Sequence, residues 1–166
     1  PIACPAGEYA PNPGMSTCLP CPAGYYCLVG SLFNRPIPCP AGSYCPKKTG
    51  TVQPRCPPGT FSNLRNLNSS KECQFCTPGR FCGSFGLVTP QGLCAGGYFC
   101  PGGAIDMYGR IGTMGGMATV WPKDQFNRQI CPLGHYCPFG STAPLMCKLG
   151  TYNNQFASIP TFWKRT

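Results

Sequence analysis

The chain has 166 residues and a formal net charge of +9, from 13 Lys and Arg against four Asp and Glu. Its 15 Cys, 22 Gly and 21 Pro are typical of a disulfide scaffold rich in turns, and they exclude a domain built around one large hydrophobic core. Disulfides at this density persist only in an oxidising compartment, so we expect an extracellular or cell-surface protein.

One frame organises the chain: Cys, two residues, Gly, one residue, then Tyr or Phe. It opens at Cys4, Cys21, Cys39, Cys56, Cys76, Cys94, Cys131 and Cys147. In the short frames a second Cys follows the aromatic residue directly, namely Cys27, Cys45, Cys82, Cys100 and Cys137. We expect the Gly to occupy a tight turn that needs positive φ, and the aromatic ring to cover a disulfide.

Long frames, at Cys4 and Cys56, are each followed by two short frames, so the order long, short, short repeats. Such self-similarity is typical of a stacked array. We divide the chain into a first round at residues 1–55, a second at 56–100, a Cys-free insert at 101–130, and a partial third round with an aromatic tail at 131–166. The expected fold is a small disulfide-rich repeat array, elongated and mostly irregular, with short antiparallel β-hairpins and little or no helix.

The third round indicates how the long frames close. Aligning the insert with the second long frame puts Gly109 and Arg128 where two Cys stood, so both Cys are missing together. Two Cys that are lost together are most simply explained as a bonded pair. This predicts the disulfides Cys4–Cys18 and Cys56–Cys73.

The short frames leave four Cys in each complete round, and four Cys allow three connectivities. We favour interleaved pairing, because a bridge within one short frame would close a very small ring. The expected bridges are Cys21–Cys39, Cys27–Cys45, Cys76–Cys94 and Cys82–Cys100. In the last round we expect Cys131–Cys147, which leaves Cys137 unpaired or bonded to an external partner.

Two interpretations of the insert stay open. It is either a degenerate long unit, in which apolar packing around Trp121 replaces the disulfide, or a contact surface for another copy of the chain. The candidate self-association residues in the insert and the tail are Tyr108, Met114, Met117, Trp121, Phe126, Phe162 and Trp163.

The residue types for catalysis or metal binding are scarce. The one His, His135, stands at the variable position of its frame, and the four acidic residues are far apart in sequence. Cys18 and Cys21 have the spacing of a zinc site, but the other Cys spacings and the scarcity of His favour disulfides. We therefore expect no enzyme activity, no metal and no cofactor.

The surface chemistry is sparse as well. Asn68 opens the one Asn-x-Ser/Thr sequon, in a polar loop, and we expect it to be glycosylated. The basic residues are scattered, which indicates a solvated surface, with contact to an acidic polysaccharide as the alternative; we expect no nucleic-acid partner. No apolar run is long enough to span a membrane, and we expect no membrane contact within this stretch, which we interpret as one segment of a longer protein.

The string CPAGYYCLVGSLFNRPIPCPAGSYC, with CPPGTF…SSKECQFCTPGRFC, resembles the ephrin-receptor-like repeats of the growth-factor-receptor cysteine-rich superfamily. The long frames are also similar to the first half of a tumour-necrosis-factor-receptor repeat. The resemblance covers nearly the whole chain outside residues 101–130, and it implies a rigid spacer or a binding module of a cell-surface protein.

We therefore expect a non-enzymatic structural segment of a cell-surface stalk or filament, of the fibre or flagellar-hair type. Its expected partners are copies of itself and, in addition, glycans. The alternative is a receptor-type ectodomain module that binds a protein or glycan ligand.

Overall fold

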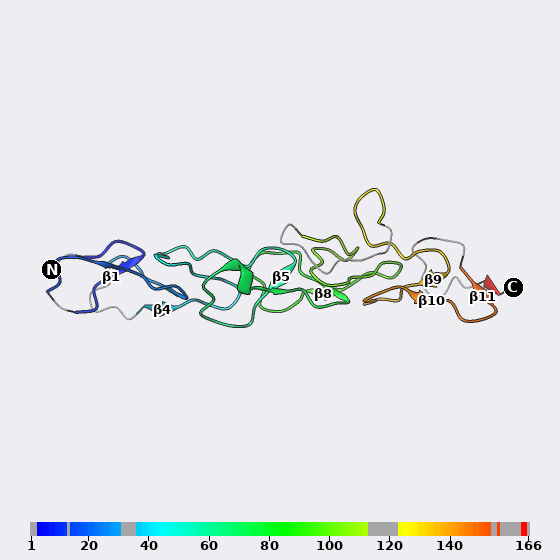
Figure 1. Cartoon of the computed structure of the whole chain (residues 1–166), viewed down its shortest axis with the longest axis horizontal. Coiled ribbons are helices and arrows are strands. Elements are labelled where there is room, and N and C mark those ends of the chain that lie inside the picture. Colours follow the sequence, from blue (N-terminus) through cyan, green and yellow to red (C-terminus); the bar gives the residue numbers. More distant parts are fainter. Residues whose placement is uncertain are drawn as a thin grey trace. The chain divides into compact units, whose positions relative to one another are not determined.

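The computed structural model describes residues 3–12, 14–30, 36–112, 123–153 and 156, together with the backbone of 164–165. Its strands are two residues long and are separated by longer irregular segments (Figure 1). They are β1 (Glu8–Tyr9), β2 (Leu19–Pro20), β3 (Tyr25–Tyr26), β4 (Ile37–Pro38), β5 (Thr60–Phe61), β6 (Gln74–Phe75), β7 (Arg80–Phe81), β8 (Gly92–Leu93), β9 (His135–Tyr136), β10 (Leu145–Met146), β11 (Thr151–Tyr152) and β12 (Lys164–Arg165). The helical element of the described residues is a 3-10 turn, η1 (Ser70–Glu72), so the expected disulfide-rich repeat array with short hairpins is confirmed.

Each frame forms the same antiparallel hairpin. The dipeptide that ends in the frame's aromatic residue pairs with the dipeptide that precedes the next frame. Strand β1 pairs in this way with β2, β3 with β4, β5 with β6, β7 with β8 and β9 with β10. In the last frame, β11 pairs with β12 in the same antiparallel manner. The bridges Ser43–Arg55 and Tyr98–Ile130 are the equivalent pairings of the Cys39 and Cys94 frames.

A tight turn at the frame's Gly leads into the first strand of each hairpin. In the Cys39 frame the N–H of Ser43 donates to the carbonyl of Pro40 at 3.2 Å, which closes a four-residue turn. Gly42 has a φ of 77°, and the Gly of every other frame also has positive φ, as the sequence predicted. An L-residue with a side chain rarely adopts this conformation.

The long frames close as predicted, by Cys4–Cys18 and Cys56–Cys73. The short frames do not interleave. Each one closes on itself, through Cys21–Cys27, Cys39–Cys45, Cys76–Cys82, Cys94–Cys100 and Cys131–Cys137. The predicted bridges Cys21–Cys39, Cys27–Cys45, Cys76–Cys94, Cys82–Cys100 and Cys131–Cys147 are therefore wrong.

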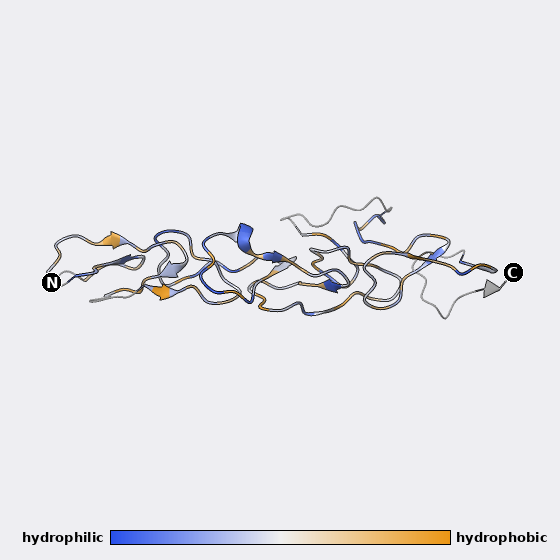
Figure 2. Cartoon of the chain, turned by 60° about the horizontal axis from the view of Figure 1, so that its bottom comes forward, coloured by the Kyte–Doolittle hydropathy of each residue, from blue (hydrophilic) through white to orange (hydrophobic). Residues whose placement is uncertain are grey.

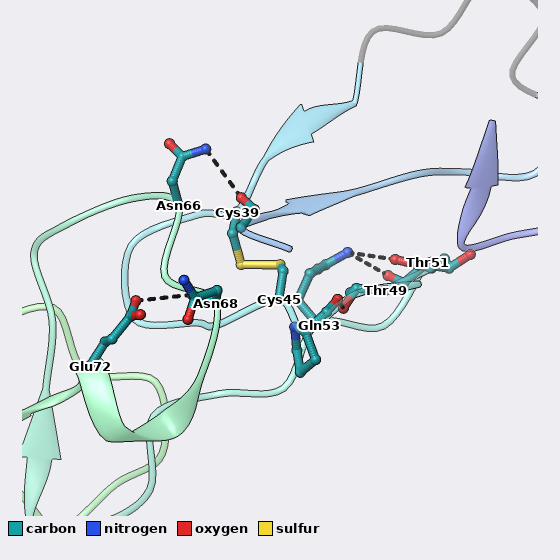
Figure 3. The surroundings of a disulfide bond; sticks show 11 residues. Cys39, Cys45, Thr49, Thr51, Gln53, Asn66, Asn68 and Glu72 are labelled. Atoms are coloured by element: carbon teal, nitrogen blue, oxygen red, sulfur yellow. Dashed lines mark hydrogen bonds between the residues drawn. A yellow bond between two sulfur atoms is a disulfide. The ribbon is translucent and has the colours of Figure 1, made fainter. Parts of the chain in front are cut away.

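The small ring of a short frame is favoured because the Gly turn has already folded the chain back. The Cα atoms of Cys39 and Cys45 lie 5.9 Å apart, within the range that a disulfide spans (Figure 3). Ring size alone is a poor guide when a turn brings the two Cys together. The free Cys is consequently Cys147 rather than Cys137.

The chain divides into two compact units. The first contains Pro1–Pro57, Ser62–Gln74 and Phe85–Thr89, and the second contains Pro58–Phe61, Phe75–Ser84 and Pro90–Thr166. The same hydrogen bonds join successive frames inside each unit. We call them the Gly ladder: the frame's Gly donates its N–H to, and accepts with its carbonyl from, the backbone of the next frame.

In the first unit, the N–H of Gly24 donates to the carbonyl of Cys45 at 2.8 Å, and its carbonyl accepts from the N–H of Cys39 at 2.9 Å. Gly7 and Gly42 repeat the arrangement with their own next frames. The donors and acceptors of the ladder are backbone groups, so the Gly ladder does not depend on which side chains the loops carry.

In the second unit, Gly59, Gly79, Gly97 and Gly134 continue the pattern. Gly97 donates to Cys137 at 2.7 Å and accepts from Cys131 at 2.9 Å, so the frames at Cys94 and Cys131 are direct neighbours in the ladder. The described residues of the insert, 101–112 and 123–130, add no rung of their own. The interpretation of the insert as a degenerate long unit depends on packing around Trp121, which lies outside the described residues, so it stays a prediction.

The core is small and lies at the disulfides, where the frame aromatics cover sulfur as expected. Tyr44 packs against the Cys56–Cys73 bridge, Phe81 against Cys94–Cys100, and Phe99 against Cys131–Cys137. In each case the ring belongs to the frame that precedes the disulfide. Figure 2 shows hydrophobic and hydrophilic residues mixed over short distances along the described chain.

Replacement of Gly42 by Ala tests the Gly ladder. A Cβ at Gly42 would lie 2.3 Å from the carbonyl oxygen of Gly86, whereas a Cβ at Gly134 would meet no atom of the described residues within 4 Å. Because both have positive φ, Gly134→Ala should lower the free energy of unfolding by about 1 kcal/mol. The backbone clash should raise the cost of Gly42→Ala to about 3 kcal/mol. Equal losses in urea titrations of the two oxidised variants would contradict the close approach.

Chymotryptic mapping of the non-reduced protein tests the local pairing. Phe85 is exposed and lies between Cys82 and Cys94, so cleavage there separates the Cys76 and Cys94 frames. With Cys76–Cys82 and Cys94–Cys100, the two cross-linked peptides should be released from each other and appear as separate masses. Peptides that stay joined until reduction would restore the interleaved pairing.

Candidate functional site

The insert holds two turns with one sequence pattern, Asp-x-aromatic-Gly/Asn-Arg, at residues 106–110 and 124–128. In the second turn, Oδ1 of Asp124 accepts hydrogen bonds from the N–H groups of Phe126 and Arg128, both at 2.9 Å. Its Oδ2 accepts from Nε of Arg128. Asp106 makes the same three contacts in the first turn, with Tyr108 and Arg110.

These turns bring an aromatic–arginine cluster together, which consists of Tyr98, Tyr108, Phe126 and Arg128. The guanidinium of Arg128 lies 5.5 Å from the ring centres of Tyr98 and Tyr108 and 4.9 Å from that of Phe126. The two Tyr rings meet edge to face at 5.0 Å. Since Tyr98 belongs to the Cys94 frame, the cluster fastens both turns of the insert to the Gly ladder.

Asp124 and Arg128 form an ion pair at the cluster, and their hydrogen bonds stabilise the charged form of each. Desolvation opposes the charge on Asp124, but hydrogen bonds from the Arg128 backbone, the Arg128 side chain and the Phe126 backbone outweigh it and lower the pKa of this carboxyl below its ordinary 3.8. The hydrogen bond to Asp124 raises the pKa of Arg128 above its ordinary value. Both groups are therefore charged at neutral pH, and the cluster presents a fixed cation among rings.

The cluster is also accessible. Phe126 is 58% exposed and Tyr108 is 38% exposed, while Arg128 lies between them with its charge already paired. Tyr and Arg are enriched among the residues that dominate protein interfaces. Of the predicted self-association residues, the structure brings Tyr108 and Phe126 together. Met114, Met117, Trp121, Phe162 and Trp163 lie outside the described residues.

Sequence reasoning missed Tyr98, Arg128 and the two Asp residues as members of this site. The signal was present as the repeated pattern DMYGR and DQFNR, in which a short acidic side chain accepts from the N–H groups that follow it. The equal spacing of Asp and Arg in both strings also predicts an ion pair across each turn.

The residues considered for catalysis are dispersed. His135 is half-buried, and its Nδ1 lies 3.0 Å from the carbonyl oxygen of Leu133. Glu8 pairs with Lys48 at 2.9 Å, and Glu72 accepts from the N–H of Asn68 at 3.0 Å. Among the described residues, no three His, Cys, Asp or Glu side chains are grouped as a metal would require.

The predicted glycosylation site, Asn68, lies at an accessible place. Its side chain is exposed, two residues before the start of η1, and its carboxamide makes no hydrogen bond within the described part of the chain. The hydroxyl of Ser69 accepts from the N–H of Lys71 at 3.3 Å and caps η1. Asn68 lies within the loop that Cys56–Cys73 closes, and a glycan on it would extend into solvent. Figure 3 shows Asn68 beside Glu72 and near the Cys39–Cys45 disulfide.

A scan against protein-family models returns no match for this chain, and a search of curated proteins also returns none. In the stretches that the structure describes, no helix has both the length and the apolar character needed to cross a bilayer.

Acidification tests the pairing of Asp124 with Arg128. Because the pKa of Asp124 is lowered on folding, the stabilisation it provides is present above the unfolded pKa and is lost as pH falls through the folded one. In a series of NMR spectra, the amide signals of Phe126 and Arg128 should titrate together with a midpoint below 3.8.

Asp124→Asn should abolish this titration, and Asp106→Asn in the other turn should leave it in place. A midpoint at or above 3.8 in the wild-type protein would contradict the stabilised carboxylate.

Proposed function

We propose that this chain is a non-enzymatic, extracellular structural segment, part of a cell-surface stalk or filament that self-associates. The observation that carries the proposal is the Gly ladder. Its frames are joined through backbone hydrogen bonds, as Gly24 is bonded to Cys39 and Cys45. Such a fold can be extended by adding frames, and each frame supports the loops of its neighbour. Such arrays act as scaffolds because each unit contacts mainly its neighbours.

The disulfides support an extracellular setting. Every described Cys except Cys147 is bonded, and a disulfide network of this density is stable only where thiols are oxidised. An exposed Asn68 is consistent with the same setting, because N-glycans are added to exported proteins.

The aromatic–arginine cluster supports self-association. It is built on residues outside the repeated frame positions except Tyr98, it is held rigid by two Asp turns, and it leaves Phe126 in solvent. A rigid aromatic surface loses little conformational entropy when it is buried by a partner. Contact through one such surface with a different surface of the next copy generates an open chain of copies.

Sedimentation and negative-stain microscopy of the oxidised protein, over a range of concentrations, test the proposal. In a Cys147→Ser background, which removes the free thiol, assemblies larger than a dimer should form. They should weaken at least tenfold in the double variant Tyr108→Ala, Phe126→Ala. The matched control is Phe85→Ala, which removes a ring that is 63% exposed away from the cluster.

A monomer at every concentration, or a double variant that assembles like its parent, would overturn the filament version. A receptor-type module that binds a protein or glycan is the second candidate, favoured by the same cluster because Tyr, Phe and Arg suit ligand contact. In that case the monomer should bind a glycan array or a cross-linked partner in a manner that Phe126→Ala abolishes.

A further inference from the structure

The two Asp turns leave their arginine side chains with unused donors. In each turn, one carboxylate oxygen of the Asp accepts from two backbone N–H groups, and the other accepts from Nε of the Arg. Among the described residues, the guanidinium of Arg128 donates through Nε to Asp124, and its two Nη groups remain for a ligand. The Arg128 side chain is 28% exposed, so solvent reaches it. Two Nη groups in one plane match the two oxygens of a carboxylate.

The surroundings of this ion pair are positively charged. Residues 73–166 include seven Lys and Arg against two side-chain carboxylates, Asp106 and Asp124. Both carboxylates are already paired within their own turns. Lys123 is exposed directly before Asp124, and the side chain of Arg110 in the first turn is 49% exposed. An anion that approaches Arg128 therefore meets an excess of positive charge.

An exposed aromatic ring stands beside these donors. Phe126 is 58% exposed, and its ring centre lies 4.9 Å from the guanidinium carbon of Arg128. The face of an aromatic ring carries partial negative charge, so it attracts the polarised C–H groups of a sugar ring that lies flat on it. Tyr108, 38% exposed with its ring centre 5.5 Å from the same carbon, extends this surface. A flat apolar surface and a carboxylate-binding group thus lie side by side.

The site is held in place by bonds within the chain. Oδ1 of Asp124 accepts from the N–H groups of Phe126 and Arg128, both at 2.9 Å, and so fixes the turn that carries the ring and the guanidinium. Tyr98 pairs with Ile130 at the base of the insert. Such a site loses little conformational entropy when a ligand binds. The disulfides indicate an extracellular setting, where polysaccharides are a source of carboxylates.

We propose that the cluster of Tyr98, Tyr108, Phe126 and Arg128 binds a uronic acid residue of an acidic polysaccharide. The sugar ring lies on Phe126, and its carboxylate accepts hydrogen bonds from the two Nη groups of Arg128. The proposal rests on the receptor-type candidate for the function and names the class of its ligand.

Titration of the oxidised chain, in the Cys147→Ser background, with a hyaluronan oligosaccharide and with its methyl ester tests the proposal. The ester keeps the sugar ring and removes the negative charge. Calorimetry is carried out at a concentration where sedimentation shows a monomer. The parent protein should bind the acid about tenfold more tightly than the ester, because only the acid forms a charged pair with Arg128.

Two variants separate the roles of the charge and the ring. Arg128→Lys keeps the charge but loses the planar group, so it should reduce the preference for the acid to about twofold or less. Phe126→Ala should weaken the acid and the ester alike. The matched controls, Arg80→Lys in β7 and Phe85→Ala, change exposed residues outside the cluster and should bind like the parent. The amide signals of the Gly ladder should be unchanged in every variant.

The proposal is overturned if hyaluronan does not bind, if the acid and the ester bind equally, or if Arg128→Lys keeps the preference for the acid. It is also overturned if heparin binds and Arg80→Lys weakens that binding as much as Arg128→Lys does, because the attraction is then a general one between a basic chain and a polyanion. Arg128→Lys keeps the rings and the charge, so it should assemble like its parent. A protein that assembles but does not distinguish the acid from the ester removes this proposal and leaves the filament proposal standing.

Discussion

The structure depends on a Gly residue that has positive φ and is hydrogen-bonded on both sides to the next frame. Gly24 illustrates the constraint, because its N–H and its carbonyl are both used by the frame that opens at Cys39. A side chain at Gly24 would destabilise the frame for two reasons. The positive φ disfavours any residue with a Cβ, and that Cβ would lie 2.7 Å from the carbonyl oxygen of Asn66. The disulfides then have a local task. In the short frames they close the Gly turn, as Cys39–Cys45 does, and in the long frames they close the larger loop. The Gly ladder joins each frame to the next, and Tyr44, Phe81 and Phe99 cover disulfides.

The turn at the frame's Gly and the packing at the disulfides could be predicted from the sequence, because the spacing of Cys, Gly and aromatic residues is typical of such a turn. The positive φ of the frame Gly and the aromatic cover on sulfur both follow from residue type. The short bridges could not be obtained from ring size, because ring size treats the chain as flexible and omits the Gly turn that brings Cys39 and Cys45 together. The long bridges were predicted correctly, from the joint loss of two Cys in the insert. The Cys that is left free is Cys147.

The aromatic–arginine cluster could be predicted only in part. Its two Asp turns are local and leave a readable pattern, DMYGR and DQFNR. The meeting of Tyr98 with Arg128 is different, because it depends on the hairpin that pairs Tyr98 with Ile130 across the whole insert. Contacts of this kind depend on the Gly ladder on both sides of the loop. They join residues that are far apart in sequence, so a short stretch of sequence does not reveal them.

The insert has a consequence for how such chains diversify. The hairpin of the Cys94 frame opens at Tyr98 and closes at Ile130, whereas that of the Cys39 frame opens at Ser43 and closes at Arg55, yet the flanking hydrogen bonds are alike. A loop that lengthens in this way costs only slowly growing closure entropy. The loops that connect the two strands of each hairpin are therefore positions where sequence and length can vary. Foreign peptides could be inserted there, in evolution or by design, while the hydrogen bonds between frames are kept.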